Sequence, residues 1–277
     1  MLLKELNDII IEQTKKGVQK PIILNLLKEH LQYYFLNFIY NSNYGKNLIF
    51  IGDSALRICY GLNRLSEDID MDIELNTTIN KQQLAEDIIK YFKQTYLFDN
   101  LEYTISGKDE KIYFKFPILK ELNISDNSES DKLYVKLEIS DIISKNYKVA
   151  LTPISKLGFN FIVKNYDIET LMTSKINAIF TRKYIKGNDE NYNFKGRDYF
   201  DLLWYLQKGV KPNMDFIKDT LKIDNLEELY KKLYDLIQNL NIKYLEEDLL
   251  PLFEDGVFIQ NYCKNYKQMI KQFLLWK

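Results

Sequence analysis

The sequence predicts an α+β fold, with a mixed β-sheet flanked by helices over residues 1–160 and a C-terminal helical domain over residues 161–277. Two observations support this prediction. In the first part, several short segments alternate apolar and polar residues with the period of two that marks a strand. From Thr170 onward, apolar residues recur at the spacing of three and four that marks a helix. The boundary is soft, near residues 150–168, because no repeat or flexible linker divides the chain.

The first part begins with helices and continues with alternating segments. Helical spacing over residues 5–40 predicts two helices that break near Gly17 and Pro21. A Gly-Asp-Ser turn and an amphipathic helix follow a short apolar run, with Asp53 or Ser54 as the predicted N-cap. Strands are predicted in DIDMDIEL, LEYTISG, KIYFKFPIL and KLYVKLEIS, a helix in KQQLAEDIIKYFKQTY, and a hairpin-type loop in ELNISDNSESDKL. The later helices are predicted in TLMTSKINAIFTRKYI, RDYFDLLWYLQKG, NMDFIKDTLKI, LEELYKKLYDLIQNL and NYCKNYKQMIKQFLLWK.

Composition and charge exclude several classes of protein. The 38 basic and 39 acidic residues nearly cancel, so bulk charge does not indicate a nucleic-acid surface. No apolar run reaches the roughly 18 residues of a membrane span, and the charged N-terminus is unlike a signal peptide, so we expect a cytoplasmic protein. Cys59 and Cys263 have no CxxC partner, which favours reduced thiols in the core.

The chain has a single histidine, His30, in a predicted helix, where we expect a structural role. Its isolation excludes His-rich zinc sites, Ser-His-Asp triads and Cys-His dyads. If the protein is an enzyme, its chemistry therefore rests on carboxylates, lysines, arginines and metal ions.

One alternating strand carries a run of acids. Asp68 and Asp70 would project from one face about 7 Å apart along the chain, and Asp72 shares that face. Adjacent carboxylates repel, and Mg²⁺ relieves the repulsion because it takes oxygen ligands from one or two carboxylates and from phosphates. A solvated strand face is the alternative. The glycine turn before the helix suits phosphate binding, and Glu138 in KLEIS either completes a metal-binding triad or is an exposed strand acid.

The segment GDSALRICYGLNRLSEDIDMDI resembles the first motif of the AbiEii/AbiGii toxin family of nucleotidyltransferases, typically Gly-Gly-Thr/Ser-Ala-Leu and then Arg-x-Ser-x-Asp-x-Asp. Further along, SKINAIFTRKYIKG and KGRDYFDLLWYL are similar to the later motifs, a Lys-x-x-Ala helix and Arg-Asp-x-x-Asp. The order fits, and the resemblance covers roughly residues 48–207. The first motif matches at Gly52, Ser54, Ala55, Leu56, Arg64, Ser66, Asp68 and Asp70.

The resemblance implies the nucleotidyltransferase fold of the DNA polymerase β-like superfamily and an NTP-dependent reaction. It implies that Asp68 and Asp70 bind Mg²⁺ (or Mn²⁺) and that Glu138 is the third acid. Lys175 would meet the triphosphate, and Asp198 would belong to the catalytic site. The nucleotide-binding residues implied are Gly52, Ser54, Arg64, Ser66, Lys175 and Arg197. Alternatively, Arg197 and Asp201 anchor two helices to each other, since positions 198 and 201 share a helix face.

This chain departs from the family pattern at Asp53, where the family has its second glycine. As an N-cap, Asp53 makes structural sense. Beside a phosphate its charge would repel, so either its side chain turns away or nucleotide binding is weakened.

The leading functional hypothesis is a Mg²⁺-dependent nucleotidyltransferase of the toxin–antitoxin type, with the tRNA 3′ end as a candidate acceptor. A basic and aromatic cluster would then hold triphosphate and RNA, although solvated helix faces explain it equally well. The alternatives are nucleotidyl transfer to a small molecule such as an antibiotic, and a catalytically silent nucleotide-binding module. The resemblance also implies a cognate antitoxin, which need not contact the toxin. The cluster comprises Lys175, Arg182, Lys183, Tyr184, Lys186, Tyr192, Phe194, Lys195, Arg197 and Tyr199.

Overall fold

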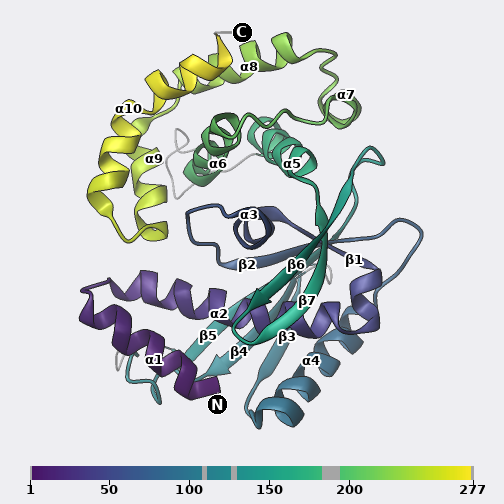
Figure 1. The fold of residues 1–277 in the computed structure, drawn as a ribbon, viewed down its shortest axis with the longest axis vertical. Helices are drawn as coiled ribbons and strands as arrows, with labels where there is room; N and C mark the ends of the chain where they lie inside the picture. The colour runs from purple at the N-terminus through teal and green to yellow at the C-terminus, as the bar shows by residue number, and fades with distance from the viewer. Residues whose placement is uncertain (1, 108–110, 126–129, 183–193, 276–277) are drawn as a thin grey trace. The chain divides into compact units, whose positions relative to one another are not determined.

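The computed structural model describes residues 2–107, 111–125, 130–182 and 194–275 (Figure 1). Contacts divide the chain into two compact units. Unit 1 comprises Met1–Ile142 and Val149–Tyr166, and unit 2 comprises Ile143–Lys148 and Asp167–Lys277. The predicted boundary between residues 160 and 161 falls inside a strand of unit 1. None of the helices in the described ranges has the length and apolarity needed to cross a bilayer.

Unit 1 contains a mixed sheet that, over the described residues, has seven strands in the order β3-β4-β5-β2-β1-β7-β6. The pairs β2–β5 and β1–β7 are parallel, and the other neighbours are antiparallel. Because β2 lies in the middle of the sheet and pairs with β5, the acids of its alternating sequence lie beside β5. The strands are β1 Leu48–Ile51, β2 Asp68–Ile73, β3 Glu102–Ser106, β4 Lys111–Pro117, β5 Lys132–Asp141, β6 Val149–Lys156 and β7 Phe159–Tyr166.

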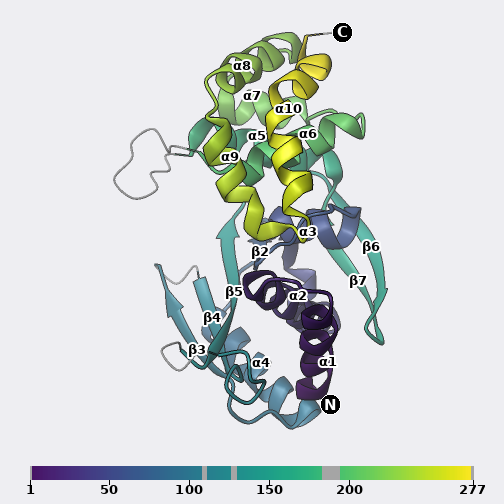
Figure 2. The ribbon, with the colours of Figure 1, turned by 90° about the vertical axis from the view of Figure 1, so that its left-hand side faces the viewer.

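Helices of unit 1 bury an aromatic core against the sheet. The alternation of β4 sends Phe114 and Phe116 inward, where they meet Phe35 and Phe92 from two helices at centroid distances of 4.8 and 5.4 Å. All four rings are fully buried, so truncating one to alanine should cost about 3–5 kcal/mol. Figure 2 shows the first two helices packed together (purple). The helices are α1 Leu2–Lys15, α2 Lys20–Tyr40, the 3₁₀ turn η1 Asn43–Lys46, α3 Gly52–Tyr60 and α4 Lys81–Tyr96.

Unit 2 is helical over its described part. Leu229, Leu233 and Ile237 form the buried stripe of α8, and α8 packs against α10, whose own buried residues include Cys263 and Ile270. Side-chain caps begin five of its helices, because Asp167, Asn213, Asn225, Asn241 and Asp255 each accept a backbone N–H of the first turn. The elements are α5 Ile168–Thr181, α6 Gly196–Gln207, α7 Met214–Leu221, α8 Leu226–Gln238, α9 Ile242–Leu249, η2 Leu250–Leu252 and α10 Gly256–Leu274.

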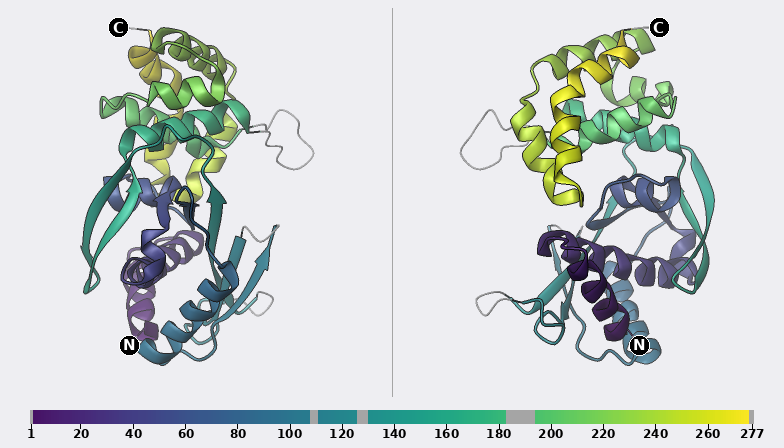
Figure 3. Two further views of the ribbon diagram at one scale, coloured as in Figure 1. Left: turned by 90° about the vertical axis from the view of Figure 1, so that its right-hand side faces the viewer. Right: turned by 60° about the vertical axis from the view of Figure 1, so that its left-hand side comes forward.

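The structure confirms the predicted fold class and most of the predicted elements, and it adds others. The antiparallel pair β6–β7 (teal in Figure 3) and the short helix α9 have no counterpart in the sequence predictions. Strand β6 lies at the edge of the sheet and contains Pro153, a residue that cannot donate a backbone hydrogen bond to a neighbouring strand. Its sequence therefore lacks the pattern from which a strand is usually predicted. The predicted N-cap is also wrong. Helix α3 begins at Gly52 with Ile51 as its N-cap, and no side chain caps it.

Candidate active site

Three acids of unit 1 share one face of the sheet. Strand β2 runs parallel to β5 with Asp70 opposite Glu138 and Asp68 opposite Lys136. Because residues i and i+2 of a strand point the same way, Asp68, Asp70 and Glu138 project to the same side. We call these three residues the carboxylate face. The sequence predicted the three acids, and the register brings them together.

A lysine ammonium already bridges two members of the carboxylate face. Lys136 Nζ lies 2.8 Å from Asp68 Oδ2 and 3.0 Å from Glu138 Oε2, and Lys111 Nζ lies 3.9 Å from the same Glu138 oxygen. Burial by itself would lower the pKa of Lys136, but the two carboxylates outweigh it and raise that pKa above its usual value. Oxygens that share one ammonium are near enough to share one cation. No role is predicted for Lys136 from the sequence, although its position two residues before Glu138 places it on the same face of the strand.

Asp70 is held in an environment that disfavours its charge. Burial, followed by the negative charges of Asp53 and Asp68, raises its pKa to about 7. Gly52, at φ +74°, lies so near that a Cβ on it would meet Asp70 Oδ2 at 2.4 Å. The turn that begins α3 therefore requires glycine for both its backbone conformation and its approach to Asp70.

Two serines of the motif fasten this turn to β2. The Ser54 hydroxyl is 2.8 Å from the Ser66 hydroxyl and hydrogen bonds the backbone carbonyl of Asp68. Gln32 donates to the Ser66 carbonyl at 3.2 Å. Both serines are buried, so their visible role is to hold the first turn of α3 against the start of β2.

The carboxylate of Asp53 forms an ion pair within the same motif. Its carboxylate Oδ2 lies 2.8 Å from Arg64 Nη2, and the Arg64 side chain is completely buried. Arg64 also donates to the backbone carbonyl of Leu65 at 3.1 Å. The negative charge that replaces the family glycine is thus paired with the arginine of the same motif.

Asp72 belongs to the interior rather than to the carboxylate face. It lies one residue before the end of β2, is buried, and accepts hydrogen bonds from Ser140 at 2.9 Å and Tyr166 at 2.6 Å. Burial raises its pKa to about 6, although these two hydrogen bonds act in the opposite direction. Its contacts link β2 to β5 and β7.

Unit 2 brings the later motif residues into a second charged group, which we call the ion-pair network. Lys175 Nζ of α5 lies 2.9 Å from both Asp198 and Asp201 of α6, and Arg182 Nη1 lies 2.6 Å from Asp198. The side chains of Lys175, Asp198 and Asp201 are 10%, 4% and 0% exposed. Arg197 is half-buried on α6. Within unit 2 these contacts join α5 to α6 through Asp198 and Asp201, whereas the helix-anchoring alternative had named Arg197 and Asp201.

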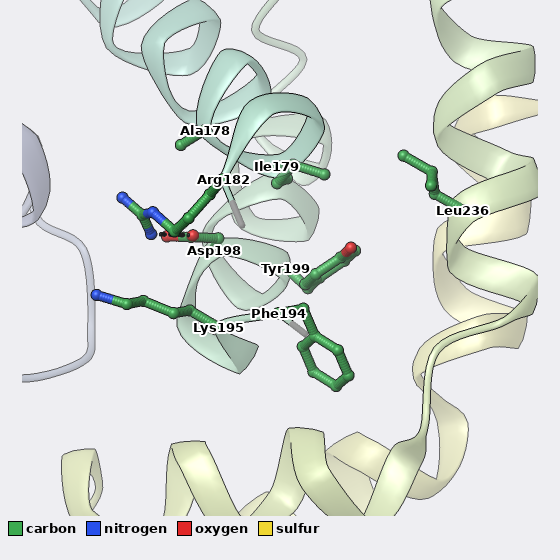
Figure 4. Close-up of a pocket in the computed structure, with 8 residues that line it drawn as sticks. All are labelled: Ala178, Ile179, Arg182, Phe194, Lys195, Asp198, Tyr199 and Leu236. Carbon is green, nitrogen blue, oxygen red and sulfur yellow. Dashed lines mark hydrogen bonds and ion pairs between the residues drawn. The ribbon is translucent and has the colours of Figure 1, made fainter. Parts of the chain in front are cut away.

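A cavity of about 160 Å³ lies beside the ion-pair network in unit 2. Figure 4 shows the Arg182–Asp198 pair on one side of it and the edge-to-face pair of Phe194 and Tyr199 on another. Arg182, Phe194 and Tyr199 belong to the predicted basic and aromatic cluster, whose Lys183, Tyr184, Lys186 and Tyr192 lie outside the described residues. The lining residues are Ala178, Ile179, Arg182, Phe194, Lys195, Asp198, Tyr199 and Leu236.

Acids on neighbouring strands of a mixed sheet, beside a glycine turn that opens a helix, are the features that the sequence resemblance leads us to expect of a nucleotidyltransferase. The chain belongs to the AbiEii family, whose model, described as the nucleotidyl transferase AbiEii toxin of a type IV toxin–antitoxin system, matches residues 35–275. It is therefore a nucleotidyltransferase of the toxin type, with an NTP as substrate and an antitoxin as partner by family.

Two crystal structures from Helicobacter pylori have a similar fold. JHP933 is 18% identical with a TM-score of 0.51, and the match covers 90% of this chain and 91% of that one. A protein described as a "putative nucleotidyltransferase" is 19% identical with a TM-score of 0.51, covering 90% and 94%. At these identities the likeness shows the fold alone. No curated protein matches the chain.

Proposed function

We propose that the protein transfers a nucleotide from an NTP to an RNA acceptor in a reaction that depends on Mg²⁺ or Mn²⁺, and that the tRNA 3′ end is the first acceptor to test. The observation that carries the proposal is the carboxylate face, in which the register aligns Asp70 with Glu138 and one ammonium is shared by Asp68 and Glu138. Oxygen-rich sites of this kind suit hard divalent cations.

The donor set of the carboxylate face fits a metal ion. Asp68, Asp70 and Glu138 supply only oxygen ligands, and a cation already lies between two of them. Burial, and after it the charges of Asp53 and Asp68, raise the pKa of Asp70, and a cation beside this carboxylate would favour its ionised form. A divalent ion held there would neutralise the triphosphate and polarise its α-phosphorus for in-line attack by a hydroxyl.

The first turn of α3 is suited to the phosphates. The N-terminus of a helix offers backbone N–H groups and the positive end of its dipole, and no side chain caps the N-terminus of α3. In this proposal Ser54, Ser66 and Arg64 position the turn rather than touch the nucleotide, because they are buried and bonded to neighbouring groups. The pairing of Asp53 with Arg64 lessens the repulsion that its charge would exert on a phosphate.

Further roles are assigned on the family motifs. Glu138 binds the metal, accepts the proton of the attacking hydroxyl, or does both. Lys175 contacts the triphosphate, with Asp198 and Asp201 orienting its ammonium, and Arg197 assists. No histidine is required, in agreement with the structural setting of His30 beside Glu5 and Tyr34.

Incubation of the chain with each labelled NTP, Mg²⁺ and total RNA tests the proposal, with Asp70→Asn as the matched inactive variant. We expect labelled RNA 3′ ends from the wild type only, and none after chelation of the metal. Equal labelling by both proteins would refute the role of Asp70. Labelling of an aminoglycoside but not of RNA would establish the small-molecule alternative. NTP binding in a calorimeter without transfer to any acceptor would establish a silent module.

A further inference from the structure

Lys136 lies against the carboxylate face, where its ammonium occupies the place that a metal ion bound by Asp68 and Glu138 would take. Lys136 Nζ lies within hydrogen-bonding distance of Asp68 Oδ2 and Glu138 Oε2, which are two of the three proposed metal ligands. A divalent ion that binds these two carboxylates would lie within a few ångströms of the ammonium. At that distance two positive charges repel strongly, more so because the site is partly shielded from water. Lys136 and a metal ion at the Asp68–Glu138 edge therefore exclude each other.

We propose that Lys136 is a tethered competitor of the metal: its ammonium occupies the Asp68–Glu138 edge in the absence of metal and is displaced when a divalent ion binds there. The inference rests on the proposed function, because it concerns the same ligands. The four-carbon stem of lysine is flexible enough to leave the two carboxylates without any movement of β5. Lys111 Nζ lies 3.9 Å from Glu138 Oε2, beyond hydrogen-bonding distance, and the proposal gives it no part in the competition.

The competition has two consequences. Without metal, the ammonium offsets part of the repulsion among Asp68, Asp70 and Glu138, so the face keeps its arrangement before the ion arrives. With metal, part of the binding free energy is spent on displacing the ammonium. Removing its charge should therefore strengthen metal binding, which is the opposite of what loss of a ligand would do.

The experiment is a titration of the full chain with Mn²⁺ in a calorimeter at about pH 8 and without NTP, so that the carboxylates are largely ionised. Lys136→Gln should bind Mn²⁺ at least about tenfold more tightly than the wild type. Lys136→Arg keeps the charge and should bind about as weakly as the wild type. The matched control is Lys132→Gln on the same strand, where the lysine pairs with Glu102 at 2.7 Å, and its affinity should not change.

Equal or weaker Mn²⁺ binding by Lys136→Gln would overturn the inference. Asp70→Asn separates this failure from failure of the metal site. If Asp70→Asn loses Mn²⁺ binding while Lys136→Gln equals the wild type, the metal site stands and the competition is refuted. If Asp70→Asn binds Mn²⁺ like the wild type, the proposed metal site fails and the inference fails with it. Lys136→Met gives the same test should the glutamine variant not fold.

Discussion

The two charged clusters of this protein differ in how they balance their charge. The carboxylate face of unit 1 sets three acids against Lys136 and the more distant Lys111, and the side chains of Asp68 and Glu138 remain about 30% exposed. The ion-pair network of unit 2 sets Asp198 and Asp201 against Lys175 and Arg182, and its carboxylates are almost completely buried. One cluster has an excess of negative charge, and the other is balanced by its own residues.

This difference in charge balance distinguishes two roles that a charged motif residue can have, a role in binding a ligand and a role in stabilising the fold. A cluster with uncompensated negative charge is stabilised by an added cation, and shifted pKa values in such a cluster are typical of a functional site. A buried, balanced cluster does not depend on an added cation, and removal of one partner mainly destabilises the fold. We therefore expect the two clusters to respond oppositely when an acid is removed.

Asp70→Asn should have the largest effect on activity. It removes a proposed metal ligand, so we expect nucleotide transfer to fall by about a thousandfold or more, because a metal contributes several kcal/mol to the transition state. Stability should not fall, since the substitution relieves a buried charge beside Asp53 and Asp68. Transfer rates and urea unfolding measure the two effects. Asp141→Asn, at the exposed end of β5, is the control, and a variant as active as the wild type would break the comparison.

Asp201→Ala should produce the opposite pattern, with a large loss of stability. The substitution leaves Lys175 without one of its two carboxylates in a buried setting, which should cost about 3 kcal/mol. Urea unfolding measures the loss, and Asp235→Ala on the exposed face of α8 is the matched control. A loss no larger than that of the control would show that the network does not stabilise unit 2.

Gly52→Ala sharpens the comparison within unit 1. A methyl group there strains the positive φ by about 1 kcal/mol and pushes against the Asp70 carboxylate, so both stability and transfer should fall. Gly61→Ala is a close control, because Gly61 has a similar φ of +76° but nothing within 4 Å of an added Cβ. Equal transfer rates in the two variants would show that contact with Asp70 is unimportant.

His30 offers the smallest effect and tests burial at a site outside both clusters. Burial lowers its pKa below 6.5, although Glu5 acts in the opposite direction. The unfolded chain therefore binds this proton more readily than the folded chain, and stability should fall as the pH falls through about 6.5. We expect His30→Gln to lose less stability than the wild type between about pH 7 and pH 5, measured by urea unfolding. The same pH dependence in both proteins would contradict this assignment.

Local pattern was enough to predict most of this fold and the acids of the candidate site. Alternation located β2 and β5, and the motif spacing singled out Asp68 and Asp70. Glu138 was identified from the alternating segment KLEIS and from the family resemblance. The alignment of these acids, however, depends on strand order, which no local pattern contains. Lys136 was overlooked for the same reason, since its partner Asp68 lies on another strand.

The partners of the charged side chains were harder to predict from the sequence than the strands and helices that carry them. Asp53 pairs with Arg64, which follows it by eleven residues, and Asp72 is satisfied by Tyr166 from a strand that the sequence did not predict. Both outcomes depend on long-range packing. Edge strand β6, with Pro153, escaped prediction because it lacks the pattern on which such predictions rest.

The most direct test of the central claim is the rate at which Asp68→Asn protein, shown to be folded, incorporates labelled nucleotide into RNA at saturating NTP and Mg²⁺. If the carboxylate face is the metal site of a nucleotidyltransferase, the wild type incorporates label and this variant stays at background. Incorporation by the variant at the wild-type rate would contradict the account.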